Sequence, residues 1–435
     1  VSINKPVDNT AYVHTLKQVT VKPPHTYHQM SIKQALSQRP STRFSIQAKF
    51  QLEYISCASQ AEPRMLRFTM DATASPRGRF REGKRWFWNV LRPVLGSFLR
   101  WHYRVRVIDP HEVRQMRPPF IIVGNHVNFW DPFLLGMIFD RPVHFLAADG
   151  NFRNRTMRCL LSLVGAIPKI KARTDLESIR VMQGLIHNRQ IVGFFPEGQR
   201  NWDGVSLPIM GGTGKLASLL RAPVVACVFH GGYLSLPRWT THIRRGRLEI
   251  ELRTIAERRE VGAVSGREIQ RRIEEALNWD DLSWQQRSGV RFVSAKRAQY
   301  LEMVGFECPK CGALGSMHST AGTVSCRDCG ISGDYGTDGL LRWFNWPEGP
   351  ATVHEWNQTQ LDNLDHRVFS GPSAAEPLAW AERLVVFRGR RAQPLFRVGL
   401  ADVVLRSDGV RFVWYARRSR LRTVGMVPTS SRISR

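Results

Sequence analysis

Residues 120–132 read FIIVGNHVNFWDP and join an apolar strand pattern to a polar turn. Residues 120–123 are a β-branched and aromatic run, which is typical of a buried strand. Asn125, His126 and Asp131 follow, with four residues between the histidine and the aspartate. Functional groups of α/β proteins gather at the carboxyl ends of strands. The stretch therefore predicts an α/β domain with a candidate catalytic histidine at a strand end.

His126 and Asp131 have the chemistry of a general base and its partner. A neutral imidazole can take a proton from an attacking hydroxyl, and a carboxylate fixes the imidazole tautomer and stabilises the imidazolium. Asp131 also precedes Pro132, a combination that is typical of a helix start. The alternative interpretation is therefore a polar turn that only begins a helix.

Short β-branched runs alternate with helical patterns around this stretch, which indicates a sheet flanked by helices. Strands are predicted at residues 120–123, 143–146, 191–195, 224–229 and 248–252, and helices at residues 132–139, 176–188, 213–221 and 268–277. The predicted domain covers residues 118–279.

A second polar turn, FPEGQR at residues 195–200, ends another predicted strand. Proline and glycine shape a tight turn that can present Glu197 and Arg200 together, and a guanidinium suits phosphate. The alternative is an ordinary strand exit with a surface ion pair.

Four sequence blocks occur in one order: the His126 motif, GAIPKIKAR at residues 165–173, FPEGQR at 195–200 and APVV at 222–225. In this order and spacing, residues 85–277 resemble the lysophosphatidic acid acyltransferase family of glycerolipid acyltransferases. The resemblance implies transfer of a fatty acyl group from acyl-CoA or acyl carrier protein to a lysophospholipid hydroxyl. The acceptor that it favours is 1-acyl-glycerol-3-phosphate, and the product is then phosphatidic acid.

The family pattern also implies residue roles. His126 would deprotonate the hydroxyl, and Asp131 would hold His126. The residues that would bind the glycerol phosphate are Glu197, Gly198 and Arg200, with Lys171 and Arg173 from the second block as further cations. The fourth block departs from the pattern, because Ala226 stands where a second proline is common.

Four cysteines form two close pairs, Cys308 with Cys311 and Cys326 with Cys329, with fourteen residues between the pairs. Each pair precedes a glycine that permits a tight turn, so the pattern predicts a zinc ribbon with four thiolate ligands. Such a closed ligand set leaves no open position, which makes the predicted Zn²⁺ structural. Unligated core or redox cysteines are the alternative.

Basic residues dominate the chain. Of its 435 residues, 63 are Lys or Arg and 36 are Asp or Glu, which gives a formal net charge of +27. An anionic partner is therefore expected. Residues 65–117 are predicted to be a basic membrane-interfacial segment, in which residues 85–103 form an amphipathic helix kinked near Pro93. A helix that packs only on its own domain is the alternative.

The rest of the chain is predicted by region. Residues 1–64 are expected to be a mostly unstructured leader, and Met65 and Met70 raise the hypothesis that natural translation begins after it. Residues 280–303 are predicted to be a linker, 304–340 the ribbon, and 341–435 an accessory β-rich region with a basic tail and a hairpin turning at Asp408 and Gly409.

No stretch of eighteen uninterrupted apolar residues occurs, and the seven cysteines do not suggest a secreted disulfide scaffold. The sequence thus predicts a peripheral or monotopic enzyme at the cytoplasmic face of an anionic membrane. Two rival interpretations are a zinc-ribbon protein that binds nucleic acid and an inactive membrane scaffold of the same fold. Nucleic acid is the weaker partner, because basic charge serves anionic membranes equally well.

Overall fold

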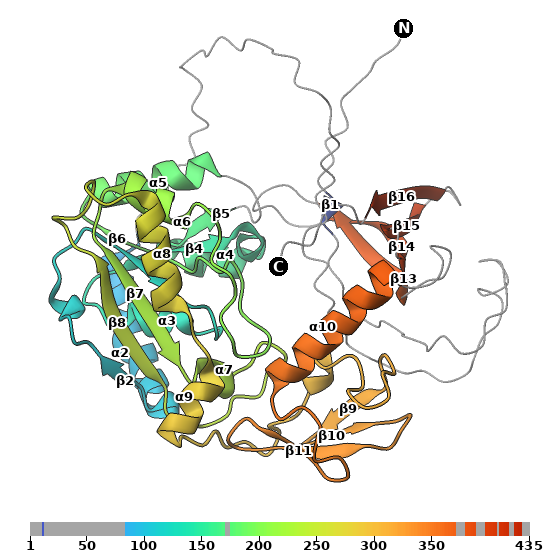
Figure 1. The fold of residues 1–435 in the computed structure, drawn as a ribbon. Helices are drawn as coiled ribbons and strands as arrows, with labels where there is room; N and C mark the ends of the chain where they lie inside the picture. The colour runs from blue at the N-terminus through green and yellow to red at the C-terminus, as the bar shows by residue number, and fades with distance from the viewer. Residues whose placement is uncertain are drawn as a thin grey trace, which may run out of the picture.

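The computed structural model describes residues 11–12, 83–169, 175–370, 379–388, 396–406, 409–416 and 422–428. These residues form a seven-stranded sheet, a four-stranded sheet and a five-stranded sheet, with helices around the first (Figure 1). The predicted leader lies outside the described residues except for the short strand β1 (Ala11–Tyr12), and so does most of the predicted basic tail.

The seven-stranded sheet has the strand order β2-β8-β7-β3-β6-β4-β5. Its strands are β2 (Arg106–Ile108), β3 (Phe120–Gly124), β4 (Val143–Ala148), β5 (Ile167–Lys169), β6 (Ile191–Phe194), β7 (Val224–His230) and β8 (Glu249–Ala256). The five strands from β7 to β5 run parallel, whereas β8 is antiparallel to β7. All five predicted strands are confirmed; β2 and β5 are additional.

The sheet separates two apolar cores. Phe120 and Ile122 of β3 point into the first core, and Ile121 and Val123 point into the second core. This alternation is expected of a strand that is buried on both faces. Helices α5 (Leu176–His187), α6 (Thr213–Leu220) and α8 (Gly266–Leu277) bury apolar residues in the second core, and α2 (Arg85–Tyr103) and α3 (Asp131–Gly136) do so in the first. The expected α/β architecture with a flanked sheet is therefore confirmed.

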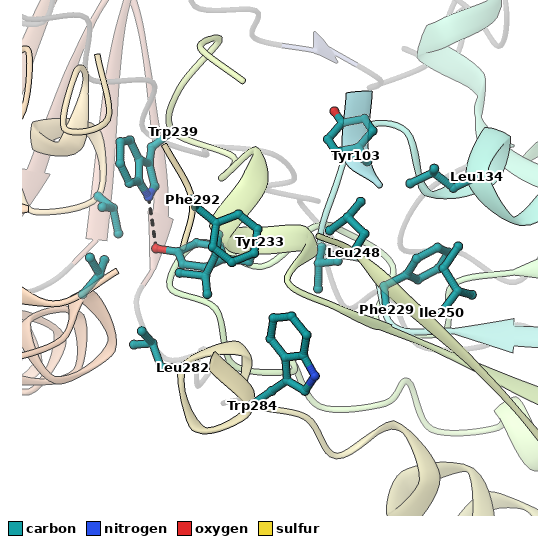
Figure 2. Packing of buried hydrophobic residues seen from close by; sticks show 14 of the residues in the cluster. Tyr103, Leu134, Phe229, Tyr233, Trp239, Leu248, Ile250, Leu282, Trp284 and Phe292 are labelled. Carbon is teal, nitrogen blue, oxygen red and sulfur yellow. Dashed lines mark hydrogen bonds between the residues drawn. The ribbon is translucent and has the colours of Figure 1, made fainter. Parts of the chain in front are cut away.

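The first core continues beyond the predicted end of the domain (Figure 2). Helix α7 (Gly232–Ser235) places the Tyr233 hydroxyl 3.2 Å from the indole nitrogen of Trp239, which donates to it. Trp284 from α9 (Asp281–Ser288) and Phe292 are buried in the same cluster. Residues 280–303, where the sequence predicts a linker, are thus packed against the sheet.

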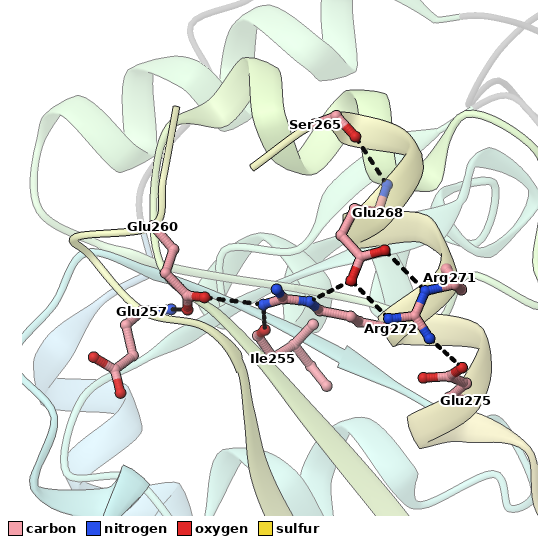
Figure 3. Close-up of polar contacts among 8 residues, drawn as sticks. All are labelled: Ile255, Glu257, Glu260, Ser265, Glu268, Arg271, Arg272 and Glu275. Atoms are coloured by element: carbon pink, nitrogen blue, oxygen red, sulfur yellow. Dashed lines mark hydrogen bonds and ion pairs between the residues drawn. The ribbon is translucent and has the colours of Figure 1, made fainter. Parts of the chain in front are cut away.

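Helix α8 is fixed at its start and along its exposed side (Figure 3). The Ser265 hydroxyl accepts a hydrogen bond from the Glu268 backbone at 3.2 Å, which caps the helix. Arg272 bonds Glu268, Glu260 and the Ile255 carbonyl, which ties α8 to the end of β8. Exposed ion pairs contribute little, so the buried apolar face of α8 supplies most of its stability.

The four-stranded sheet has the order β12-β11-β10-β9, and its buried residues belong to the first core. Its strands are β9 (Met317–Thr320), β10 (Thr323–Cys326), β11 (Ser332–Tyr335) and β12 (Leu341–Trp343). Strand β12 extends this sheet past residue 340, where the sequence predicts the ribbon to end.

Helix α10 (Val353–Ser370) follows the ribbon, and the sequence did not predict it. The five-stranded sheet comes next, with β13 (Ala379–Arg388), β14 (Phe396–Arg406), β15 (Gly409–Ala416) and β16 (Arg422–Pro428). Arg406 pairs with Gly409 across β14 and β15, so the two strands form a hairpin; Gly409 belongs to β15 rather than to the predicted turn, and Asp408 lies outside the described residues. The C-terminal region is therefore β-rich, with one long helix before its sheet.

Helix α2 is the segment that the sequence predicts to be interfacial. It is a single helix of 19 residues that includes Pro93. A second amphipathic helix, α4 (Arg155–Leu163), was not predicted. Among the helices that the structure describes, none is long and apolar enough to cross a membrane.

Candidate active site

His126 and Asp131 form a dyad at the carboxyl end of β3. The His126 Nδ1 atom lies 2.9 Å from Asp131 Oδ2, and the same oxygen accepts the backbone N–H groups of Val127 and Asn128 at 2.8 Å each. Asp131 also begins helix α3, so the helix start that Asp131 and Pro132 predict is present. The turn closes on the carboxylate and thereby sets the position of the imidazole.

The dyad combines a buried carboxyl group with a partly exposed imidazole. The Asp131 side chain is fully buried, whereas 22% of the His126 side chain is exposed. Burial raises the pKa of Asp131, and its hydrogen bonds from His126, Asn128 and Val127 oppose that rise. With Nδ1 directed at Asp131, the His126 Nε2 atom is the one available to take a proton.

The His126 ring is also held by stacking. It lies on the Phe195 ring, with ring centroids 4.3 Å apart and planes inclined by 18°. Phe195 in turn stacks on Phe145 of β4 at 5.7 Å. These stacked rings, from three neighbouring strands, thus restrict the orientation of the His126 imidazole. The stacking was not predicted from the sequence.

Glu197 joins the two polar turns. Its Oε1 atom accepts the backbone N–H of His126 at 3.0 Å, and its Oε2 atom accepts the backbone N–H of Leu207 at 3.1 Å. The side chain is buried, and burial raises its pKa to about 8. Both carboxyl oxygens are engaged inside the protein, so this arrangement gives no support to the expected contact between Glu197 and a glycerol phosphate.

The FPEGQR segment forms the tight turn that its sequence predicts. The Gly198 N–H donates to the Phe195 carbonyl at 3.0 Å, and Gly198 adopts a φ of +72°, which favours glycine. Arg238 donates to the Arg200 carbonyl at 2.7 Å, and its guanidinium lies 4.5 Å from the centroid of the Trp202 ring. Arg238 therefore fixes the backbone that carries Arg200.

A second backbone bond closes the site. The Asn201 N–H donates to the His126 carbonyl at 3.2 Å, one residue after Arg200. Together with the Glu197 contact, this bond places the two motifs side by side at one edge of the sheet. The structure thus brings together His126, Asp131, Glu197, Gly198 and Arg200.

The second sequence block reaches the same edge. Lys169 ends β5 beside Ala148 of the parallel strand β4, and burial lowers the pKa of Lys169. Lys171 and Arg173, the two predicted phosphate ligands of this block, lie outside the described residues.

The fourth block lies elsewhere. Val224 pairs with Ile121 near the start of β3, whereas Gly124 at the end of β3 pairs with Cys227. Residues 222–226 are buried, and those within β7 pair with Ile121, Ile122 and Val123 of β3, before the strand end that carries His126. Their role in this structure is to begin a core strand.

Two asparagines brace the His126 turn against β7 and α7. Asn125 donates to the Phe229 carbonyl at 3.1 Å and accepts the Phe229 N–H at 2.8 Å. Asn128 donates to the Gly232 carbonyl at 3.1 Å and accepts the Trp130 N–H at 3.0 Å. Asn128 was not predicted as part of the site, because an asparagine in a turn has no distinctive sequence signal.

The four predicted ligand cysteines lie together at the ribbon. Their sulfur atoms are all within 4.8 Å of one another, with Cys308 and Cys329 at 3.7 Å and Cys311 and Cys326 at 3.8 Å. A tetrahedral site with Zn–S bonds of about 2.3 Å has sulfur separations of about 3.8 Å. The donor set and its spacing therefore fit one tetrahedral metal ion.

The two cysteine turns, residues 308–312 and 326–330, are called the first and second knuckle, and they have the same backbone pattern. Gly312 donates to the Cys308 carbonyl and Gly330 to the Cys326 carbonyl, and both glycines have a φ near +70°. The cysteine N–H groups bond the carbonyls of Ala313 and Ile331 at 2.9 and 2.8 Å. This repetition gives both thiolate pairs a common geometry.

Comparison with known proteins adds a family to this geometry. Residues 104–230 match the family described as Acyltransferase. The chain is 28% identical over 113 residues to the 1-acyl-sn-glycerol-3-phosphate acyltransferase of Bacillus subtilis (strain 168), which covers 26% of this chain and 56% of that protein. It is also 28% identical over 172 residues to the human 1-acyl-sn-glycerol-3-phosphate acyltransferase beta, which covers 37% of this chain and 60% of that protein.

A solved structure is also similar. The crystal structure of the 1-acyl-sn-glycerophosphate (LPA) acyltransferase PlsC from Thermotoga maritima has a TM-score of 0.39 and 17% identity, and the match covers 47% of this chain and 81% of that one. The chain spans 56–60% of the length of the two curated relatives above.

The matched residues 104–230 contain the His126 motif and the FPEGQR turn, so this part of the chain resembles an acyltransferase domain. Within that family, its similarity is to the lysophosphatidic acid acyltransferases.

Proposed function

We propose that this protein transfers a fatty acyl group from acyl-CoA or acyl carrier protein to the hydroxyl of a lysophospholipid, with 1-acyl-glycerol-3-phosphate as acceptor and phosphatidic acid as product. The single observation that carries the proposal is the His126–Asp131 dyad, bonded through the His126 backbone to the turn that bears Arg200. The relatives named above support the substrate class.

In the proposed reaction, His126 Nε2 removes the proton from the acceptor hydroxyl while its oxygen attacks the thioester carbonyl. Asp131 stabilises the imidazolium that forms. The carbon–sulfur bond then breaks, and the imidazolium returns the proton to the leaving thiolate. No covalent enzyme intermediate is required, because a thioester is activated enough for positioning and base catalysis.

Arg200 is the proposed ligand of the acceptor phosphate, with Lys171 and Arg173 as further cations and Gly198 leaving room for the headgroup. A guanidinium can bind phosphate through two parallel hydrogen bonds. Glu197 was expected to bind the glycerol phosphate. We assign it a structural role instead, in which it holds the His126 turn against Leu207.

An anionic membrane is the proposed source of the acceptor, and α2 offers the docking surface. Five large apolar residues are exposed along one side of the helix: Trp86, Val90, Val94, Phe98 and Trp101. They recur every three or four positions, whereas Trp88, Leu99 and Tyr103 are buried on the opposite side. An apolar stripe on a basic segment is typical of an interfacial helix.

The surface around this stripe favours the same partner. The Lys84 N–H donates to the Leu163 carbonyl at 2.8 Å, so the start of α2 meets the end of α4. Met157 and Leu160 of α4 are exposed, and so is Phe129, which lies between His126 and Asp131 in the sequence. We infer that the catalytic turn itself approaches the lipid surface.

The four-cysteine centre is the proposed site of a structural Zn²⁺. Four thiolates close the coordination shell, so the ion would stabilise the ribbon fold and supply no catalytic position. The cytoplasmic face is the proposed location, because free thiolates of a metal centre persist in a reducing compartment.

The proposal is tested with purified full-length protein, palmitoyl-CoA and vesicles that contain 1-acyl-glycerol-3-phosphate. Release of the free thiol and formation of phosphatidic acid are the expected results. Monoacylglycerol, which lacks the phosphate, is expected to be a poor acceptor. Salt-sensitive binding to nucleic acid, with no thiol release for any lysophospholipid, would instead favour the nucleic-acid-binding alternative.

A further inference from the structure

Asp203 lies three residues after Arg200, and helix α10 holds it. The Asp203 Oδ2 atom lies 2.9 Å from His354 Nδ1 and accepts the side-chain N–H of Asn357 at 3.0 Å. Asp203 is buried. Because α10 follows the ribbon by sequence, more than 150 residues separate the partners of these two bonds.

The same helix is bonded to the segment that enters the first cysteine knuckle. Trp356 donates to the Glu307 carbonyl at 2.8 Å, and Gln360 accepts the Phe306 N–H at 3.0 Å. Asn363 donates to the Glu307 carboxylate at 2.8 Å. Glu307 directly precedes Cys308.

Near its other end, α10 reaches the knuckle itself. Arg367 donates to the Gly312 carbonyl and to the Glu307 carboxylate, both at 3.1 Å. Successive turns of one helix therefore contact the acyltransferase domain and then the knuckle, and Figure 1 shows α10 leading from the ribbon strands to the C-terminal sheet.

The loop that contains Asp203 is the loop that completes the candidate active site. On one side of Asp203, Asn201 bonds the His126 carbonyl; on the other, Leu207 bonds Glu197. Release of Asp203 would therefore loosen the backbone that bears Arg200.

We propose that Asp203 is a positioning residue for acceptor binding, and that α10 is the rigid link through which the four-cysteine centre fixes the 199–207 loop. The acceptor-binding part rests on the proposed function. The link between the metal centre and the loop does not, since it depends only on the contacts of α10.

The first test separates positioning from bulk stability. His354→Ala removes the contact with Asp203, and His354→Asn retains a donor where Nδ1 lies. We expect His354→Ala to raise the KM for the phosphate-bearing acceptor about tenfold, as for loss of a hydrogen bond to a charged group, with kcat changed less than about twofold. His354→Asn should restore the KM. His366→Ala, an exposed position on the same helix, is the matched control.

An unchanged KM in His354→Ala would overturn the proposal. A fall in kcat as large as the rise in KM, which His354→Asn does not reverse, would also overturn it. Asn357→Ala provides a second variant with the same expected direction, should His354→Ala fold poorly.

The second test needs no activity. Full-length protein is treated with a chelator and its zinc content is measured. The rate of backbone hydrogen exchange is then measured for each peptide of a proteolytic digest. We expect metal loss to speed exchange in residues 199–207 and re-addition of Zn²⁺ to reverse it. In the His354→Ala/Asn357→Ala variant, metal loss should no longer alter this loop.

Unchanged exchange in residues 199–207 after metal loss would overturn the link, and so would an equal increase throughout strands β3 to β7. If no lysophospholipid is acylated in any assay, the proposed function fails while the exchange result still decides the link.

Discussion

The backbone N–H of His126 donates to Oε1 of Glu197 at 3.0 Å, across 71 positions of sequence. Through this bond, the carboxylate of one motif sets the backbone of the other. The second carboxyl oxygen holds Leu207, so Glu197 connects three segments at the edge of the sheet. The arrangement explains why an acid is buried in the FPEGQR turn: its two carboxyl oxygens bond backbone N–H groups of two other segments.

Replacing Glu197 by Gln should destabilise the protein. A carboxyl group offers an acceptor oxygen to each N–H, whereas an amide offers one oxygen and would leave one buried N–H unpaired. The expected loss is about 1–3 kcal/mol in the free energy of unfolding, measured by urea denaturation. Glu348→Gln, at an exposed position, is the matched control and should change the free energy little; equal stability of Glu197→Gln and wild type would contradict the role.

The cost of Glu197→Gln should depend on pH. Because burial raises the pKa of Glu197 from 4.5 to about 8, the folded protein retains a proton that the unfolded chain loses in this interval. The Glu197 carboxyl group therefore contributes fully to the free energy of unfolding below pH 4.5, and this contribution falls as the pH rises to 8. The difference in unfolding free energy between wild type and Glu197→Gln should shrink from pH 5 to pH 8. A difference that grows with pH would refute the buried, protonated state.

Replacing Asp131 by Asn should impair catalysis more than folding. The amide oxygen can still accept the N–H groups of Val127 and Asn128, but a neutral side chain does not stabilise the His126 imidazolium. We expect kcat to fall by about 10²–10⁴-fold, the range for loss of an acid–base contribution. Thiol release measures the rate, and circular dichroism reports the fold. Wild-type turnover in Asp131→Asn would show that the carboxylate is dispensable.

A charge placed in the apolar stripe of α2 should weaken membrane binding. Val94 is 69% exposed at the middle of the stripe, so Val94→Glu adds a buried charge only when the helix docks. We expect severalfold less cosedimentation with vesicles that contain anionic lipid. Asn89→Glu makes the same charge change on an exposed flank of α2 and should bind better than Val94→Glu. Equal binding of the two variants would argue against the stripe.

Local patterns predicted much of this fold. The β-branched runs at residues 120–123 and 224–229 favour strands through their local sequence alone, and both form strands. The turns after the two cysteine pairs were also predictable, because Gly312 and Gly330 adopt the positive φ that such turns require. The motif spacing also predicted that His126 and Arg200 would share one edge of the sheet, because parallel strands place their ends together.

What the sequence could not predict depends on distant contacts. Helix α9 lies in a segment that reads as polar, and its burial arises from packing of Trp284 in the first core. The sequence around Glu197 is equally typical of a surface residue that binds a ligand. Its structural role becomes visible only through its hydrogen bonds with the backbone of His126 and Leu207. His354 and Asp203 have no pattern in common, so their contact emerges only from the three-dimensional fold.

Whether His126 is the catalytic base is tested by the acyltransferase rate of His126→Ala, assayed with palmitoyl-CoA and 1-acyl-glycerol-3-phosphate in anionic vesicles. Wild-type protein should release thiol and form phosphatidic acid. His126→Ala should lose at least about 10²-fold in rate while it binds the same vesicles and unfolds at nearly the same urea concentration. Turnover by His126→Ala close to that of the wild type would contradict the assignment of this imidazole as the base.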